Sequence, residues 1–120
     1  MERGGFDLEE RTAAFGEAVI DFALALSVTP VTRSLIDQLV RAGTSIGANY
    51  CEANEADTKR EFRYRINLCR RESKETRHWL RMIVRAVTSA ADDARLLWRE
   101  SDELARIFAT IHRSSAPKPT

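Results

Sequence analysis

Apolar residues recur every three or four positions along almost the whole chain, which is the spacing that places side chains on one face of an α-helix. Polar stretches interrupt this pattern near residues 27–29, 55–58 and 88–93. The pattern predicts four helices, which run from Asp7 to about Ser27, from Pro30 to about Asn54, from Thr58 to about Val87, and from the residues after Asp93 to about Arg113.

Three of these helices begin with residues that typically cap a helix N-terminus. Asp7 and Thr58 are each followed three residues later by a Glu, which is the spacing of a capping box. Thr29 precedes Pro30, and proline fits the first helical position because its missing N–H would have no partner there. No Pro or Gly interrupts the segment after Thr58, so we expect a long third helix.

One face of each predicted helix is apolar and forms the candidate core. The four stripes are Leu8, Phe15, Ala18, Val19, Phe22, Ala25 and Leu26; Leu35, Leu39, Ala42, Ile46, Tyr50 and Ala53; Phe62, Ile66, Cys69, Ser73, Leu80, Ile83, Val84 and Val87; and Leu97, Leu104, Phe108 and Ile111.

Composition indicates a single helical domain. The chain has 120 residues, of which 43% are hydrophobic and 31% are charged, with only 5 Gly and 3 Pro. Short connections make consecutive helices antiparallel neighbours. We therefore expect an all-α fold, an antiparallel up-down-up-down four-helix bundle over residues 1–113, followed by a disordered tail over residues 114–120.

Several features favour a cytoplasmic protein. No apolar run approaches the roughly 20 residues that span a bilayer, and Met1–Phe6 lacks the features of a signal peptide. Cys51 and Cys69 lack metal-ligand spacing, so we expect both to be reduced thiols.

The third helix carries more apolar surface than one core stripe requires. Leu68, Trp79 and Met82 lie well away from the stripe that contains Ile66 and Leu80. A helix that is apolar around so much of its circumference must bury the additional side. We expect these three residues to form the subunit interface of a homo-oligomer, although Trp79 could instead simply close the rim of the core.

Two segments resemble a known family. The segment Thr44–Asn49 and the residue Phe62 after Thr58 match its pattern, together with Glu72, Glu75, Thr76, Trp79 and Leu80. On these residues the chain resembles the four-helix bundle proteins whose founding members are encoded in intervening sequences of bacterial 23S ribosomal RNA genes. The resemblance spans most of residues 6–113. The chain departs from the family pattern at His78, where Tyr is commoner, and at Arg70, Arg71 and Lys74, which are often acidic.

The resemblance implies an assembly and two kinds of partner. Family relatives form open-ended barrels of five subunits, so it implies a pentameric ring for this chain. A related group serves as the accessory protein of diversity-generating retroelements and contacts reverse transcriptase and nucleic acid. The resemblance therefore implies RNA or DNA, or a protein such as reverse transcriptase, as partners.

Polar residues at helical spacing predict a network between the second and third helices. Its expected members are Arg41, Ser45, Asn49 and Glu52 on the second helix and Glu72 and Glu75 on the third. Carboxylates in a buried seam must be paired, and Arg41 and Arg65 are the nearby candidates. We expect this network to have a structural role.

No constellation predicts catalysis. Glu75 and His78 form the Glu-x-x-His step of carboxylate di-iron bundles, which normally contain two such steps. The other histidine, His112, is preceded at the required spacing by Ala109. No Gly-rich phosphate loop is present either. We expect a non-enzymatic protein with no metal and no cofactor.

Charge is distributed unevenly although the formal net charge is +1. Residues 59–85 contain 10 Lys or Arg against 3 Glu, whereas residues 1–28 contain 2 against 6 acidic residues. Six cations of the third helix fall within about 40° of one direction, in a stripe about 33 Å long. They are Arg63, Arg70, Lys74, Arg77, Arg81 and Arg85.

This stripe supports two hypotheses for function. It predicts contacts with nucleic-acid phosphates without base specificity, multiplied around a ring. The alternative is a structural or adaptor protein that binds a protein partner, in which case the stripe is a solvated face or is paired with acidic residues of the first helix.

Overall fold

The computed structural model describes residues 7–118, and within them the chain is all-α, with four α-helices and no strand. The helices are α1 (Leu8–Leu24), α2 (Pro30–Asn54), α3 (Lys59–Ala86) and α4 (Ala91–Ser114), and a short 3₁₀ helix, η1 (Thr88–Ala90), precedes α4. The predictions for residues 1–6 and for the last two residues of the tail lie outside the described residues.

The three predicted N-terminal caps are present. Asp7 Oδ1 accepts a hydrogen bond from the Glu10 amide at 3.1 Å, and Thr58 Oγ1 accepts one from the Glu61 amide at 3.0 Å. At the start of α2 the cap is reciprocal: Thr29 Oγ1 accepts from the Thr32 amide at 3.1 Å, and Thr32 Oγ1 accepts from the Thr29 amide at 2.7 Å. These local bonds fix where three helices begin.

The helix ends differ from the prediction at two places. α1 ends at Leu24, three residues before Ser27. α4 begins at Ala91 and so includes Asp92 and Asp93, which the prediction placed in a polar break. Both carboxylates lie in the first turn of α4, where negative charge is favourable. The polar residues Asp92 and Asp93 therefore belong to the start of a helix rather than to a loop.

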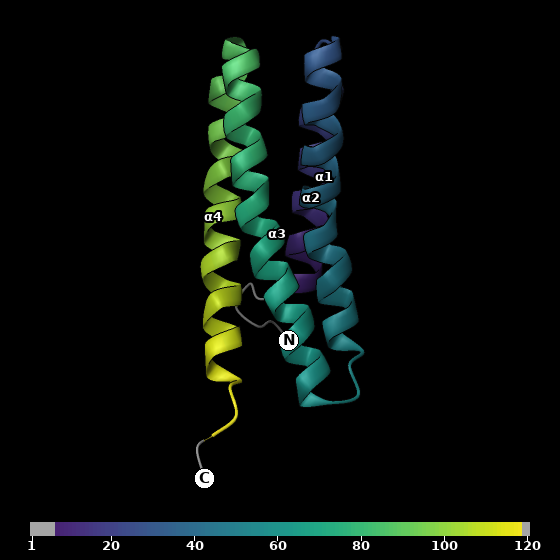
Figure 1. Ribbon diagram of the computed structural model, residues 1–120, viewed down its shortest axis with the longest axis vertical. Helices are drawn as coiled ribbons and strands as arrows, with labels where there is room; N and C mark the ends of the chain where they lie inside the picture. Colours follow the sequence, from purple (N-terminus) through teal and green to yellow (C-terminus); the bar gives the residue numbers. More distant parts are fainter. Residues whose placement is uncertain (1–6, 119–120) are drawn as a thin grey trace.

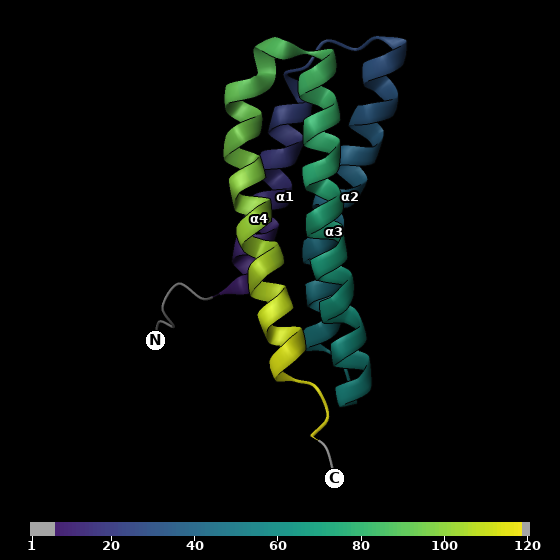
Figure 2. The same ribbon diagram turned by 60° about the vertical axis from the view of Figure 1, so that its left-hand side comes forward.

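The helices pack in a chain of neighbours. α2 packs against both α1 and α3, and α3 packs against both α2 and α4, whereas α1 and α4 contact each other least. The α2–α3 connection lies at the lower end of the molecule in Figure 1 and the α3–α4 connection at its upper end. The described part measures 53 × 31 × 20 Å, and the turned view in Figure 2 shows all four helices running along its long axis.

The core follows the predicted apolar stripes. Its largest fully buried side chains include Phe108, Leu39, Ile46, Ile66 and Leu80. Of the predicted core residues, Ala25 is the exposed one. Several small polar residues are also buried, namely Thr12, Ser73, Thr76 and Ser101, and their hydroxyls donate to carbonyls of their own helices. Their hydrogen bonds are satisfied without taking space from the neighbouring helix.

Glycines allow α1 and α2 to approach closely. A Cβ at Gly43 would lie 2.9 Å and 3.0 Å from the two Cγ atoms of Val19 and 3.2 Å from its Cβ. Val19 is completely buried, and its branched side chain has little rotamer freedom. At Gly16, by contrast, the nearest neighbour of an added Cβ would be the Thr44 Cα at 3.6 Å, an ordinary contact.

This contrast gives a paired prediction for stability. Gly43→Ala should lower the free energy of unfolding by roughly 1–2 kcal/mol, because overpacking against Val19 outweighs the gain in helix propensity. Gly16→Ala is the matched control and should be neutral or stabilising by up to about 1 kcal/mol. Urea unfolding of both variants measures the difference, and equal effects would contradict the close approach at Gly43.

The two cysteines differ in environment. Cys51 is exposed, whereas Cys69 is buried and donates its S–H to the Ile46 carbonyl at 3.5 Å. Burial raises the pKa of the Cys69 thiol to about 12. At moderately alkaline pH this thiol therefore ionises only in the unfolded chain, which stabilises the unfolded state. The stability that the buried, protonated thiol contributes is complete below about pH 8.5 and is lost as the pH rises toward 12.

We therefore expect one reactive thiol in the folded protein. A thiol reagent such as DTNB should titrate Cys51 rapidly and Cys69 only after addition of denaturant. Between pH 8 and pH 10 the wild type should lose roughly 2 kcal/mol more unfolding free energy than Cys69→Ala. Rapid reaction of both thiols under native conditions would show that Cys69 is accessible.

Candidate functional site

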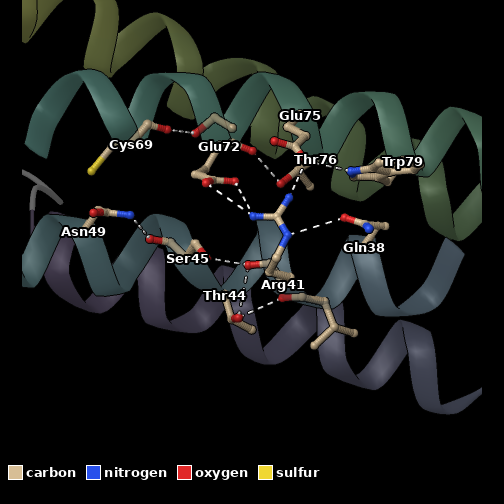
Figure 3. Close-up of polar contacts among 12 residues, drawn as sticks. Gln38, Arg41, Thr44, Ser45, Asn49, Cys69, Glu72, Glu75, Thr76 and Trp79 are labelled. Carbon is tan, nitrogen blue, oxygen red and sulfur yellow. Dashed lines mark hydrogen bonds and ion pairs between the residues drawn. The ribbon is translucent and has the colours of Figure 1, made fainter. Parts of the chain in front are cut away.

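Arg41 on α2 joins two carboxylates of α3 (Figure 3). Its Nη1 lies 3.3 Å from Glu72 Oε1, and its Nη2 pairs with Glu75 Oε2. The same Glu75 oxygen accepts a hydrogen bond from Trp79 Nε1 at 3.1 Å. We call Arg41, Glu72, Glu75 and Trp79 the polar cluster. Its α3 members are spaced by three and four residues, which puts them on one side of the helix, toward α2.

The other predicted network members lie along α2 with different partners. Ser45 Oγ donates to the Arg41 carbonyl at 2.6 Å, and Asn49 Nδ2 donates to the Ser45 carbonyl at 3.0 Å. Arg65 Nη1 donates to Asn49 Oδ1 at 3.2 Å, which forms a second link from α3 to α2. Glu52 is exposed. The predicted set thus contains two cross-links, Arg41–Glu72/Glu75 and Arg65–Asn49, plus local bonds within α2.

The polar cluster is less buried than the sequence suggested. The side chains of Arg41 and Glu75 are 46% and 39% exposed, and that of Glu72 is 19% exposed. Water therefore screens these ion pairs, and each contributes less than a pair in a dry seam.

The Glu75–His78 motif lies at this partly exposed cluster. Glu75 is bound by Arg41 and Trp79, and His78 is exposed, with its ring edge against Trp79 at a centroid distance of 4.8 Å. Within residues 7–118, no group of three or more His, Cys, Asp or Glu side chains could hold a metal ion.

The predicted basic stripe of α3 faces α4. Arg63 Nη2 donates to the His112 carbonyl at 3.0 Å, and Arg77 pairs with Asp102 on α4. Arg70 is half-buried and donates to Asn67 on its own helix at 3.0 Å. The remaining three members, Lys74, Arg81 and Arg85, are exposed and form no ion pair within the described residues.

Four arginines of α4 extend this stripe, and the sequence analysis did not identify them. Arg95, Arg99, Arg106 and Arg113 are all exposed, and their spacing places them within about 40° of one direction. Arg95 lines a groove together with Arg81 of α3, and Arg106 shares Asp102 with Arg77. Their spacing was visible in the sequence, but only the packing of α4 beside α3 shows that Arg81 and Arg95 line one groove and that Arg77 and Arg106 share Asp102.

We call the two sets together the basic surface. It comprises Arg63, Arg70, Lys74, Arg77, Arg81 and Arg85 of α3 and Arg95, Arg99, Arg106 and Arg113 of α4. Near its lower end, burial and the charges of Arg63 and Arg70 lower the pKa of His112. The imidazole is therefore neutral at pH 7, and it does not add to the positive charge there.

The apolar residues assigned to a subunit interface, Leu68, Trp79 and Met82, are each half-buried in the single chain. The large apolar side chains that the described chain exposes lie mostly on other elements. They are Ile20, Leu24, Val28, Val31, Tyr64, Leu96 and Trp98.

The half-exposed polar cluster predicts a small energetic role in one chain. Arg41→Ala should lower the free energy of unfolding by about 1 kcal/mol or less, and a double-mutant cycle with Glu75→Gln should give a coupling of roughly 0.2–1 kcal/mol. Arg33→Ala, an exposed arginine of the same helix, is the control. A cost above about 3 kcal/mol would contradict this partial exposure and would indicate that the cluster is covered.

Comparisons with known proteins agree with this architecture. The chain is similar to a crystal structure, at 1.70 Å resolution, of a protein with unknown function from the S23 ribosomal protein family of Bacteroides thetaiotaomicron VPI-5482. The two share 22% sequence identity with a TM-score of 0.75, over 88% of this chain and 97% of that one. No curated protein matches the sequence significantly.

Two further findings concern the whole chain. In the part that the structure describes, none of the helices is both long and apolar enough to cross a membrane. The sequence profile described as 23S rRNA-intervening sequence protein matches residues 10–110. The chain therefore belongs to the 23S rRNA-intervening sequence protein family.

Proposed function

We propose that this protein is a non-enzymatic, oligomeric nucleic-acid-binding protein that contacts the phosphates of RNA or DNA through its basic surface. The observation that carries the proposal is that cations of α3 and α4 meet along the contact between these helices: Arg81 and Arg95 line the same cavity, and Arg77 and Arg106 share one carboxylate. Although the net charge of the chain is only +1, residues 59–85 carry 10 Lys or Arg against 3 Glu.

The contacts divide the basic surface into an inner and an outer set. Arg63 and Arg77 hold α4 against α3 through the His112 carbonyl and Asp102. Lys74, Arg81 and Arg85 project from the same side of α3 without an ion pair inside the described chain. The outer set is therefore available for phosphates, whereas the inner set supports the fold.

The nucleophiles of the described chain favour a non-enzymatic role. The Cys69 thiol is buried with a pKa raised to about 12, so it remains protonated near neutrality. The carboxylate of Glu75 is occupied by Arg41 and Trp79. Neither group has the neighbours that an activated nucleophile or a general base requires.

The proposal includes assembly into a ring. The four helices form an antiparallel up-down-up-down bundle, and five bundles form a pentamer in which Leu68, Trp79 and Met82 lie between subunits. Support comes from the partial exposure of Trp79 and Glu75, which an adjacent subunit would cover, and from the family to which the chain belongs. A ring would repeat the basic surface on each subunit and multiply its contacts with one nucleic acid.

The outer set gives the test of this proposal. The triple variant Lys74→Glu, Arg81→Glu, Arg85→Glu should abolish binding to structured RNA and duplex DNA in fluorescence anisotropy at 50 mM salt. Three phosphate contacts predict that wild-type affinity falls about 40-fold between 50 and 200 mM salt for each engaged subunit. The conservative variant Lys74→Arg, Arg81→Lys, Arg85→Lys is the matched control and should retain binding.

Light scattering on the same samples separates the two hypotheses for function. The triple Glu variant should keep the oligomeric state of the wild type. No binding of either nucleic acid by the wild type at low salt would reject the proposal. Dissociation of the oligomer by the triple change would identify the outer set as a subunit contact. The hypothesis of nucleic-acid binding would then give way to the alternative, an adaptor that binds a protein partner such as a reverse transcriptase.

A further inference from the structure

A groove of about 270 Å³ opens between α3 and α4 next to Trp98. Its base is apolar and is formed by Leu80, Val84, Ala91 and Ala94. Two cations, Arg81 of α3 and Arg95 of α4, also line it, one from each side. The groove therefore combines an aromatic ring, an apolar base and two guanidinium groups within one small space.

Trp98 is held in place although it is exposed. The side chain retains 41% of its accessible surface, which is unusual for an indole in a folded chain. The Arg77 guanidinium lies 5.3 Å from its ring centroid and is itself paired with Asp102, one turn further along α4. This cation–π contact fixes the ring from one side.

Trp98 also lines the groove, and the order of residues along the two helices puts the groove and Arg77 on opposite sides of it. The residues that line the groove on α4, namely Ala91, Ala94 and Arg95, all precede Trp98, whereas Asp102 and its partner Arg77 lie toward the opposite end. The ring thus separates the Arg77–Asp102 pair from the cavity. An aromatic face backed by a cation and open on the other side is suited to stacking.

We propose that this groove binds an unpaired nucleobase of single-stranded RNA or DNA, with the base stacked on Trp98 and the adjoining phosphates contacted by Arg81 and Arg95. This inference rests on the proposed function and names the form of nucleic acid that the basic surface prefers. A planar ring with an anionic substituent matches the aromatic face, the apolar base and the two arginines. Paired bases in a duplex have both faces stacked already, so they cannot enter.

The experiment compares a single-stranded 20-nucleotide oligodeoxyadenylate with its blunt duplex. Trp98→Ala should weaken binding of the single strand by roughly 5- to 150-fold, the range expected for one lost stacking contact, and should leave duplex binding unchanged. Trp98→Phe, which keeps an aromatic face, should lose less than Trp98→Ala. Leu96→Ala, at an exposed apolar residue of α4 that does not line the groove, is the matched control and should bind both probes like the wild type.

Fluorescence provides a second measurement that does not depend on the stability of the Ala variant. In Trp79→Phe the emission comes from Trp98 alone, because the chain has 2 Trp. The single strand should quench this emission saturably, and the duplex should not. Quenching by adenosine monophosphate with the same affinity as by the oligonucleotide would overturn the assignment to single strands and would indicate a mononucleotide site.

The outcomes distinguish this inference from the function on which it rests. If the wild type binds neither probe, the proposed function fails. If the wild type binds both probes but Trp98→Ala changes neither affinity, or weakens both equally, the proposed nucleobase site is wrong. Binding of nucleic acid by the basic surface is then still supported. Circular dichroism of each variant identifies any loss of affinity that results from unfolding.

Discussion

The packing of α3 between α2 and α4 is the constraint on which the rest of the structure depends. Only a narrow stripe of α3 is buried, and it runs through Ile66, Cys69, Ser73, Thr76 and Leu80. Because this stripe fixes the rotation of the helix, it also fixes which polar residues flank it. One flank meets α2 with carboxylates and the other meets α4 with cations.

Arginine–carboxylate ion pairs link α3 to both neighbouring helices, but α3 supplies the carboxylates on one flank and the arginine on the other. On the α2 side, an arginine of the neighbouring helix binds the carboxylates Glu72 and Glu75 of α3. On the α4 side, Arg77 of α3 binds Asp102 of the neighbouring helix. Both contacts are only partly shielded from water, so they specify the register of the helices more than they stabilise them. The free energy of folding comes mainly from the apolar stripes.

The basic surface shows how one set of residues can serve both folding and binding. Arg63 donates to the His112 carbonyl near the end of α4, where a positive charge also complements the helix dipole. Arg77 orients Trp98 and pairs with Asp102. Because these two residues hold α3 and α4 together, their replacement would alter the contact between the helices as well as the charge of the basic surface. The exposed cations around them can be changed with less effect on the fold.

The sequence by itself determined the features that depend on neighbours along the chain. The caps at Asp7, Thr29 and Thr58 and the apolar stripes follow from spacings of three and four residues, and the all-α fold with four helices follows from them. The family was also recognisable from residues within α2 and α3. The start of α4 was placed too late, because acidic residues suit both a loop and a first helical turn.

Tertiary structure alone decided how far each polar residue is buried and which residues of different helices meet. Spacing identified Arg41, Glu72 and Glu75 as candidates for pairing, but only their exposed fractions in the folded chain show that water reaches them. Nothing local to Trp98 indicates that Arg77 covers one face of its ring while Arg81 borders the cavity next to it. That arrangement depends on the relative position of α3 and α4 along the bundle axis. The packing of their buried side chains determines this position.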